Sequence, residues 1–151
     1  MRMSVRIEGP VINRSIQDVF EFISQMENSP LWGRAVKSTK DSDGPVSVGT
    51  VFLELAEDDG QPLSKRTEVI EFDPPTRFSY LSRYENGMTE LARVTFETVG
   101  DGTRVSPEAD VEIPGVPQEQ APTFSQEMRS GVLGLLENLK DVLESPDQPV
   151  T

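Results

Sequence analysis

The 151-residue sequence contains neither cysteine nor histidine. Without cysteine there is no disulfide framework, no thiolate nucleophile and no thiolate metal ligand. Without histidine there is no imidazole to act as a general base or to bind a metal. We therefore expect no bound metal and no cofactor, and any catalysis has to use carboxylates, hydroxyls, amines, guanidinium groups or bound water.

Basic residues are scarce. The chain has 14 Lys and Arg against 26 Asp and Glu, which gives a net charge of −12. Binding to nucleic acid needs clustered Lys and Arg, and docking on anionic lipid needs them too. The composition argues against both partners. The simplest interpretation of the acidic charge is solubility, and a cationic partner is the alternative.

Long apolar runs are missing. No stretch approaches the roughly 18 apolar residues of a membrane-spanning helix. Residues 1–8 are too polar for a signal peptide, so we expect a cytoplasmic location. The length fits one domain, which we place at residues 1–145, followed by a flexible tail at residues 146–151.

Strand patterns fill most of the chain before residue 114. A first strand is predicted at residues 5–12, and a helix begins at Ser15, whose spacing to Asp18 resembles a capping box. A second short helix or turn contains Trp32. Further strands are predicted at residues 36–40, 50–55, 65–72, 77–84, 88–99 and 103–113. The pairs Asp59-Gly60, Asn86-Gly87 and Asp101-Gly102 predict tight hairpins between them.

The strongest periodic signal lies at residues 122–144. Apolar side chains recur there at three- and four-residue steps, from Phe124 and Met128 to Leu143. The pattern predicts an amphipathic helix across the sheet, with Met128, Leu135 and Leu139 buried. Gly131 and Gly134 interrupt it, and they indicate either close packing against the sheet or room for a ligand.

The order of these elements resembles a known family. Four segments carry the resemblance: VINRSIQDVFEFISQMENSPLW at residues 11–32, VGTVF at 48–52, EFDPPTRFSY at 71–80 and GDGTRV at 100–105. Together they are similar to the START-like (SRPBCC) superfamily in its polyketide cyclase/dehydrase branch, over roughly residues 4–144. The resemblance implies an α+β helix-grip fold. In that fold a curved seven-stranded antiparallel sheet wraps around a long C-terminal helix, with two short helices between the first two strands.

The resemblance also implies a cavity between the concave sheet face and the helix. Candidate ligand-binding residues are those that the strand and helix patterns place on its walls: Trp32, Phe52, Phe78, Tyr80, Ser82, Glu90, Phe124, Met128 and Val132. Glu90 shares a strand face with Ala92 and Val94, although a position in water beyond the core is the alternative. The strand at residues 50–55 is ambiguous, because either Glu54 or its neighbours Leu53 and Leu55 could point inward.

The function most consistent with this pattern is binding of a small hydrophobic or aromatic molecule that is polyketide-, quinone- or lipid-like. A polyketide cyclase or dehydratase acting in the same cavity is the alternative, and an interaction module without a ligand is the third possibility. We expect a monomer or homodimer, no nucleic acid and no membrane span.

Overall fold

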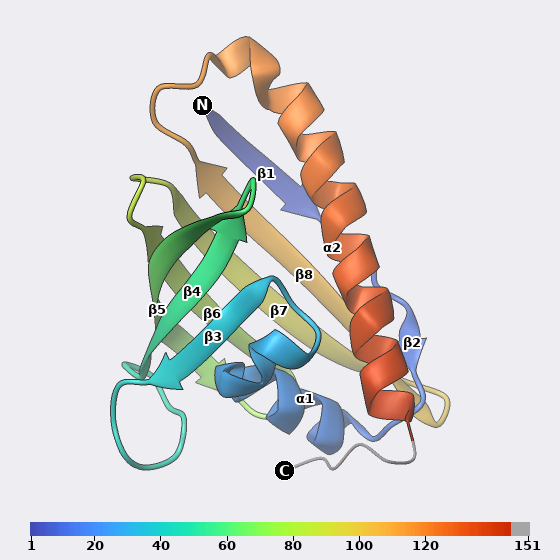
Figure 1. Ribbon diagram of the computed structural model, residues 1–151. Coiled ribbons are helices and arrows are strands. Elements are labelled where there is room, and N and C mark those ends of the chain that lie inside the picture. Colours follow the sequence, from blue (N-terminus) through green and yellow to red (C-terminus); the bar gives the residue numbers. More distant parts are fainter. Residues whose placement is uncertain (146–151) are drawn as a thin grey trace.

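A curved antiparallel sheet and one long helix dominate the computed structural model, which describes residues 1–145 (Figure 1). The strands lie in the order β1-β8-β7-β6-β5-β4-β3, and the short β2 pairs with β8 beside β1. The long helix α2 crosses the concave side of the sheet. This arrangement confirms the predicted helix-grip fold. The predicted tail at residues 146–151 lies outside the described residues.

The elements have the following bounds. The strands are β1 (Arg2–Arg6), β2 (Val11–Ile12), β3 (Ala35–Lys40), β4 (Val51–Asp58), β5 (Gln61–Asp73), β6 (Arg77–Tyr84), β7 (Thr89–Val99) and β8 (Gly102–Glu112). The helices are α1 (Ile16–Ser24), the short η1 (Met26–Leu31) and η2 (Gln118–Gln120), and α2 (Ala121–Glu144).

The predicted first strand is two strands, so that prediction was wrong in detail. Both pieces pair with β8, and the chain passes between them at Gly9. A Cβ on Gly9 would lie 2.3 Å from the carbonyl oxygen of Val105, so only glycine fits this close approach. Pro107 of β8 faces this gap, and its carbonyl accepts a hydrogen bond from the Ile7 amide at 2.9 Å. β8 therefore continues through the proline, because no paired strand needs its missing N–H at the gap between β1 and β2.

All three predicted hairpins form, and the turn of the third is displaced by one residue to Gly100-Asp101. Asp59 and Gly60 both have positive φ, at 50° and 77°, and Gly87 has a φ of 92°. In the last hairpin the positive φ belongs to Gly100, at 59°, rather than to Asp101 or Gly102. Gly102 already lies in β8, where a Cβ would come within 2.6 Å of the Ile12 carbonyl oxygen. Close packing, not turn geometry, requires that glycine.

Helix α1 closes one end of the space between the sheet and α2. The side chain of Ser15 caps it by accepting a hydrogen bond from the Asp18 amide at 3.2 Å. The apolar face of α1 packs Phe20 among the rings of Phe72, Phe78 and Phe96, with ring centroids 5.0 to 5.8 Å apart. This aromatic cluster forms the dry core at that end of the molecule.

Helix α2 is buried along its C-terminal half only. Leu136, Leu139 and Leu143 belong to the core, whereas Met128 and Leu135 are half-buried. The prediction that Met128 and Leu135 are buried was therefore wrong in degree, because both are only half-buried. Periodicity identified the correct face of the helix, but the N-terminal half of that face borders a cavity instead of packed side chains.

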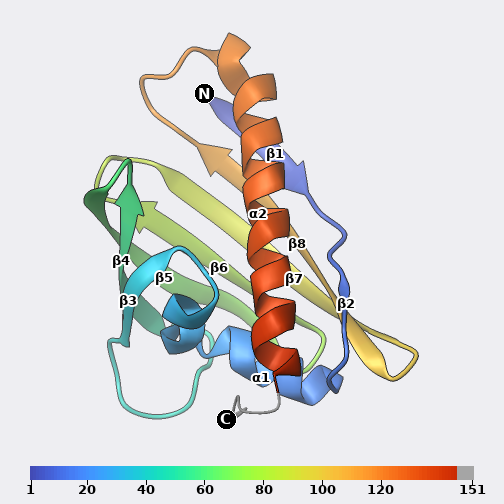
Figure 2. The same cartoon turned by 45° about the vertical axis from the view of Figure 1, so that its right-hand side comes forward.

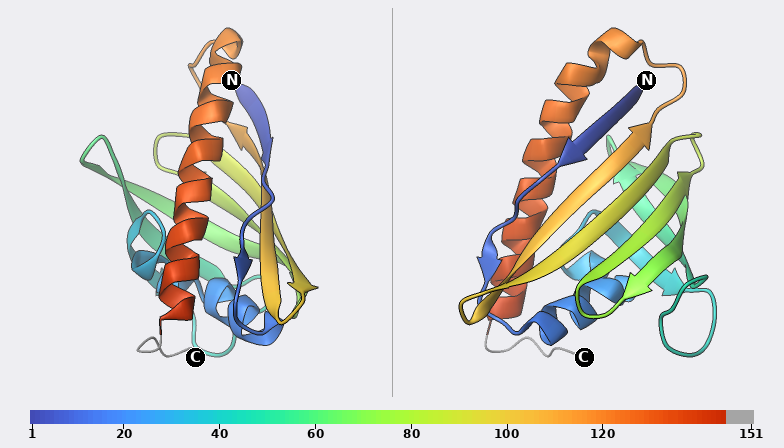
Figure 3. Two further views of the ribbon diagram at one scale, coloured as in Figure 1. Left: turned by 90° about the vertical axis from the view of Figure 1, so that its right-hand side faces the viewer. Right: turned by 180° about the vertical axis from the view of Figure 1, so that it is seen from behind.

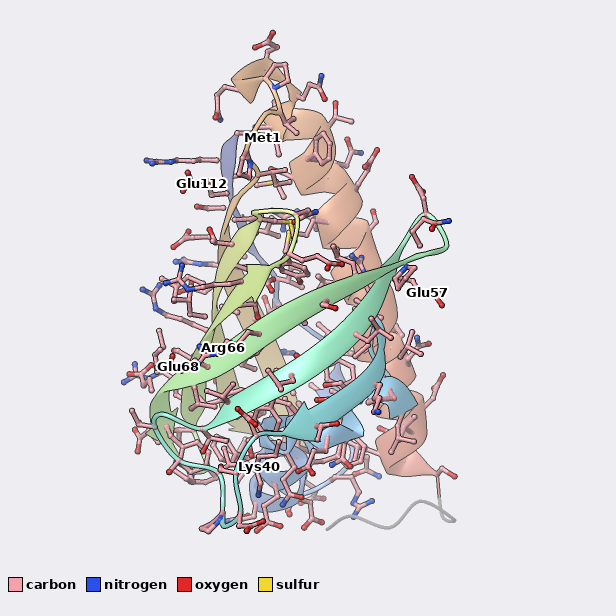
Figure 4. All side chains as sticks on the ribbon, turned by 60° about the vertical axis from the view of Figure 1, so that its left-hand side comes forward. Met1, Lys40, Glu57, Arg66, Glu68 and Glu112 are labelled. Atoms are coloured by element: carbon pink, nitrogen blue, oxygen red, sulfur yellow. The ribbon has the colours of Figure 1, made fainter. Side chains whose placement is uncertain are left out.

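The outer face of the sheet is covered by polar and charged side chains. Figure 4 shows Arg66 and Glu68 projecting from β5 on the side away from α2. Viewed from behind, the same face of β6, β7 and β8 carries no helix (Figure 3). Arg93 lies there, paired with Glu108 at 3.1 Å, as its position in the strand pattern predicts. Within residues 1–145, no helix is long and apolar enough to cross a membrane.

Two leucines on α2 provide a test of this packing. Leu139→Ala should lower the free energy of unfolding by about 2–5 kcal/mol, because it opens a hole in a closed core. Leu135→Ala should cost clearly less, because its side chain already borders open space. Chemical denaturation of both variants measures the difference. Equal losses would contradict a helix that is packed at one end and borders a cavity at the other.

Candidate functional site

A cavity of about 620 Å³ lies between the concave sheet face and α2. That volume falls within the range of about 300–1,000 Å³ found for small-molecule sites. Strands β1 and β4 to β8 form its floor, the N-terminal half of α2 forms one wall, and η1 with the start of β3 forms another. Figure 2 shows α2 lying over the β1 side of the sheet, while β3, β4 and β5 curve forward on the other side.

Strand register arranges the inward side chains of β4 to β7 in rows. In one row Glu54, Lys65 and Tyr84 are successive cross-strand partners. The next row along the strands contains Phe52, Thr67, Ser82 and Glu90. A third row places Val69, Tyr80 and Ala92 together. Because cross-strand partners share a face, these rows gather most of the polar groups on one part of the floor.

The first row is a charged cluster. The Lys65 ammonium lies 3.6 Å from a Glu54 carboxylate oxygen and donates to the Tyr84 hydroxyl at 3.4 Å. Burial disfavours the ammonium, but Tyr84, Glu54 and Glu90 more than offset this, so the pKa of Lys65 lies above its ordinary value. Burial, and then the charge of Glu90, raise the pKa of the Tyr84 phenol. At neutral pH the cluster therefore contains a charged amine and a neutral phenol.

Hydroxyl groups beneath this row provide hydrogen bonds for the carboxylate of Glu54, which is 5% exposed. Thr67 donates to the Glu54 carboxylate at 3.1 Å, and the Thr67 and Ser82 hydroxyls are 2.8 Å apart. Since the single hydroxyl hydrogen of Thr67 goes to Glu54, Ser82 has to donate to Thr67. The chain of donors explains how a carboxylate is tolerated in this position.

Glu90 differs from Glu54, because within residues 1–145 its carboxyl group has no hydrogen bond and no ion pair. It lines the cavity from β7. Burial raises the pKa of Glu90, while the nearby charges of Lys65 and Arg34 oppose that shift without cancelling it. The hydroxyl of Tyr80, on the adjacent strand, also has no hydrogen-bond partner in the described part of the chain, and burial raises its pKa well above the ordinary value.

Arg34 lies at the edge of the cavity, between η1 and β3. Its guanidinium reaches α2 at Gly131, where an added Cβ would come within 2.1 Å of Nη2. Gly134, one turn further along, has no atom within 4 Å of the same position. Close packing against the sheet was one of the two expectations for these glycines. At Gly131 the close contact is instead with the side chain of Arg34.

Most of the rest of the wall is apolar, although Glu57, Asn86 and Glu127 also border the cavity. Strands β1 and β8 contribute Met3, Val5, Ala109 and Val111, and α2 contributes Phe124, Met128, Val132 and Leu135. The cavity therefore has a polar region on β4 to β7 and an apolar region under α2. An apolar molecule with oxygen atoms along one edge would match both regions.

Seven of the nine candidate residues line this cavity: Trp32, Phe78, Tyr80, Glu90, Phe124, Met128 and Val132. The other two lie in the layer beneath it. Phe52 is completely buried against Met26 and Val69, and Ser82 is completely buried beside Thr67. The ambiguity at β4 is also resolved, because Glu54 points inward while Leu53 is 46% exposed.

Sequence reasoning missed Lys65 and Arg34, and it did not include Tyr84 among the candidate residues. The signal for Lys65 was present, because it alternates with Thr67 and Val69 while Arg66 and Glu68 take the other face. Arg34 follows the irregular η1 segment, where no periodic pattern indicates direction. Among residues 1–145, no group of three or more carboxylates could hold a metal ion.

Replacement of the two glycines of α2 tests the contact with Arg34. Alanine in a helix interior is favoured over glycine by about 1 kcal/mol, and Gly134→Ala should gain most of that because the site is open. Gly131→Ala should gain less, because it has to displace the Arg34 guanidinium. Adding Arg34→Ala to Gly131→Ala should remove the difference. Thermal denaturation measures all variants, and equal gains without Arg34→Ala would contradict the contact.

The raised pKa of Glu90 predicts how stability depends on pH. The folded state binds the Glu90 proton more tightly than the unfolded state, so stability is lost as pH rises through the folded pKa. Glu90→Gln cannot ionise and should escape that loss. We subtract the melting temperature of the parent from that of Glu90→Gln at each pH. This difference should increase from acidic to mildly alkaline pH. Glu97→Gln, on the outer face of the same strand, is the matched control and should show a smaller change. A constant difference at Glu90 would contradict the prediction.

Solved structures with this fold include three informative examples. The di-domain ARO/CYC BexL from the BE-7585A biosynthetic pathway aligns with a TM-score of 0.75 and 18% identity, over 95% of this chain and 50% of its own. TTHA0849 from Thermus thermophilus aligns with a TM-score of 0.70 and 20% identity, over 91% and 94%. Ara h 8.0201 aligns with a TM-score of 0.69 and 15% identity, over 95% and 98%. These likenesses show the fold, and the chain spans only about half of BexL.

Sequence comparison gives the family. No curated protein matches the chain. The family model described as "Polyketide cyclase / dehydrase and lipid transport" matches residues 4–144, nearly the whole chain. That span contains every strand and helix that builds the cavity except the first residues of β1. The chain therefore belongs to the polyketide cyclase/dehydrase and lipid transport family.

Proposed function

We propose that this protein binds a small, mainly apolar molecule, polyketide-, quinone- or lipid-like, in the cavity between the sheet and α2. The observation that carries the proposal is the cavity of about 620 Å³, whose walls are mostly apolar with a few polar groups gathered on one side. A packed protein interior has few voids larger than a water molecule. The cavity is open to solvent, so water fills it when it is empty, and an apolar molecule that displaced this water would bury its apolar walls.

The family supports the same proposal, because its description covers both cyclases and lipid transport. The residues that contact the ligand in this proposal are the lining residues of the two regions. Tyr80, Tyr84 and Lys65 contact its polar edge, while Met128 and Val132 contact its apolar body. Trp32, half-buried at the cavity wall, covers it from the η1 side.

A polyketide cyclase or dehydratase is the second candidate, and Glu90 is the observation that favours it. A carboxyl group with a raised pKa, and with no hydrogen-bond partner among residues 1–145, can give a proton to a substrate oxygen as a general acid. BexL is an ARO/CYC, but its two domains together are about twice the length of this chain. An interaction module without a ligand is the remaining possibility, and the experiment below includes it as an outcome.

A cavity-filling substitution on α2 tests the proposal. Val132→Phe places a ring in the cavity, whereas Leu133→Phe places one at a neighbouring position that is 39% exposed. Overfilling a packed site costs about 1–3 kcal/mol, so Val132→Phe should weaken binding at least about fivefold. Leu133→Phe should leave it nearly unchanged.

The measurement begins with native mass spectrometry of freshly purified protein, to find a molecule that purifies with it. A thermal-shift screen with quinones, fatty acids and polycyclic aromatics follows. Binding that Val132→Phe and Leu133→Phe affect equally would place the ligand outside the cavity. If no compound binds and none purifies with the protein, the proposal fails and an interaction module becomes the better explanation.

A further inference from the structure

Four residues of the cavity lining are also exposed to solvent, so they mark the mouth of the cavity: Arg34, Glu57, Asn86 and Glu127. They come from the η1–β3 connection, the end of β4, the β6–β7 turn and α2. On the concave side of the sheet, η1 and the start of β3 lie across from α2 (Figure 1). A ligand that enters the cavity has to pass between these segments.

The side chain of Arg34 lies across this mouth. Its backbone belongs to the η1–β3 connection, while its guanidinium lies against α2, at the place that a Cβ on Gly131 would take. The neighbour of Gly131, Val132, lines the cavity, and so does Arg34 itself. One side chain therefore connects two opposite walls of the cavity and covers part of the opening between them.

No polar contact within residues 1–145 fixes Arg34 in this position. Its guanidinium has neither a hydrogen bond nor an ion pair there, and because the residue is exposed, water can solvate the N–H groups. Packing against α2 is what remains, and individual packing contacts are weak. Exposed side chains change rotamer within picoseconds to nanoseconds. Arg34 can therefore leave α2 without any movement of the backbone.

We propose, building on the proposed function, that Arg34 is a strap that rests on Gly131 and swings aside to let a neutral apolar ligand enter and leave. Arginine suits this role because its methylene stem can cover apolar material while its charged end stays in water. Glycine at position 131 permits the closed position, since any side chain there would occupy the seat of the guanidinium. A strap that makes equal contacts over the empty and the filled cavity changes the rates of exchange and not the affinity.

The exchange rates of a neutral fluorescent probe, N-phenyl-1-naphthylamine, test the strap. Stopped-flow fluorescence measures its association and dissociation rate constants. Arg34→Ala should raise both by about fivefold, the factor that corresponds to a displacement cost of about 1 kcal/mol, and leave the dissociation constant nearly unchanged. A residue that only contacts the ligand would change mainly the dissociation rate constant. A residue that only supports the fold would change neither.

The two glycines of α2 provide a matched pair. Gly131→Ala should raise both rate constants, because it displaces Arg34 from its seat, and it should have no further effect once Arg34→Ala is present. Gly134→Ala makes the same change where nothing lies within 4 Å, so it should leave both rate constants unchanged. Lys37→Ala controls for charge, because it removes a positive charge from an exposed position of β3 outside the cavity lining. It should also leave both rate constants unchanged.

A second measurement needs no ligand. Trp32 is the single tryptophan of the chain, and it lines the cavity close to Arg34 in the sequence. Acrylamide is a small neutral quencher, so its access to Trp32 reports how far the mouth is covered. Arg34→Ala should increase the quenching of Trp32 emission, and Gly131→Ala should increase it as well. Gly134→Ala and Lys37→Ala should leave the quenching unchanged.

The outcomes separate this inference from the proposed function. If the probe binds and Arg34→Ala changes only its dissociation, or changes neither rate constant, the strap is overturned and cavity binding stands. Equal effects of Gly131→Ala and Gly134→Ala overturn the seat on α2, and the strap with it. If no neutral apolar compound binds, the proposed function fails, and the quenching alone decides about Arg34. Quenching that Arg34→Ala leaves unchanged would then show that Arg34 does not cover the mouth.

Discussion

The structure depends on how α2 is held against the sheet. Its C-terminal half is fixed by buried leucines and by polar contacts to the segment around β2. Lys140 donates to the Val11 carbonyl at 2.8 Å, and Arg14 donates to the Leu143 carbonyl at 2.7 Å. The N-terminal half is held on the β1 side, where Arg129 donates to the Arg6 carbonyl at 2.7 Å. The helix thus closes the core at one end and covers an open space at the other.

The curvature of the sheet makes that space possible. Helix α2 lies over the β1 and β8 side of the sheet. Strands β3 to β5, on the other side, curve forward (Figure 2). Side chains from both parts line the same cavity. The aromatic cluster around Phe20 seals the end near α1, so the cavity extends toward the β4–β5 hairpin and the start of α2.

The electrostatics of the cavity follow from its depth. A carboxylate taken out of water needs hydrogen bonds or an opposite charge. Glu54 has both, through Thr67 and Lys65, and so is part of the framework. Glu90 has neither within residues 1–145 and so retains a capacity that the fold itself does not use. This contrast between two inward glutamates separates a structural carboxyl group from a candidate functional one.

The sequence alone determined the elements, their order and most of the inward face. Alternation along a strand and the spacing of a helix are local properties, so Tyr80, Glu90 and Val132 could be placed on the correct faces without coordinates. Tertiary structure decided whether a face meets another surface or a space. Met128 and Leu139 look alike in the helical pattern, yet one lines the cavity and the other is core, because sheet curvature varies along α2. The alternation of β5 encodes the inward direction of Lys65, but its neighbours Glu54 and Tyr84 depend on cross-strand register. The position of Arg34 depends on an irregular connection, which no local pattern encodes.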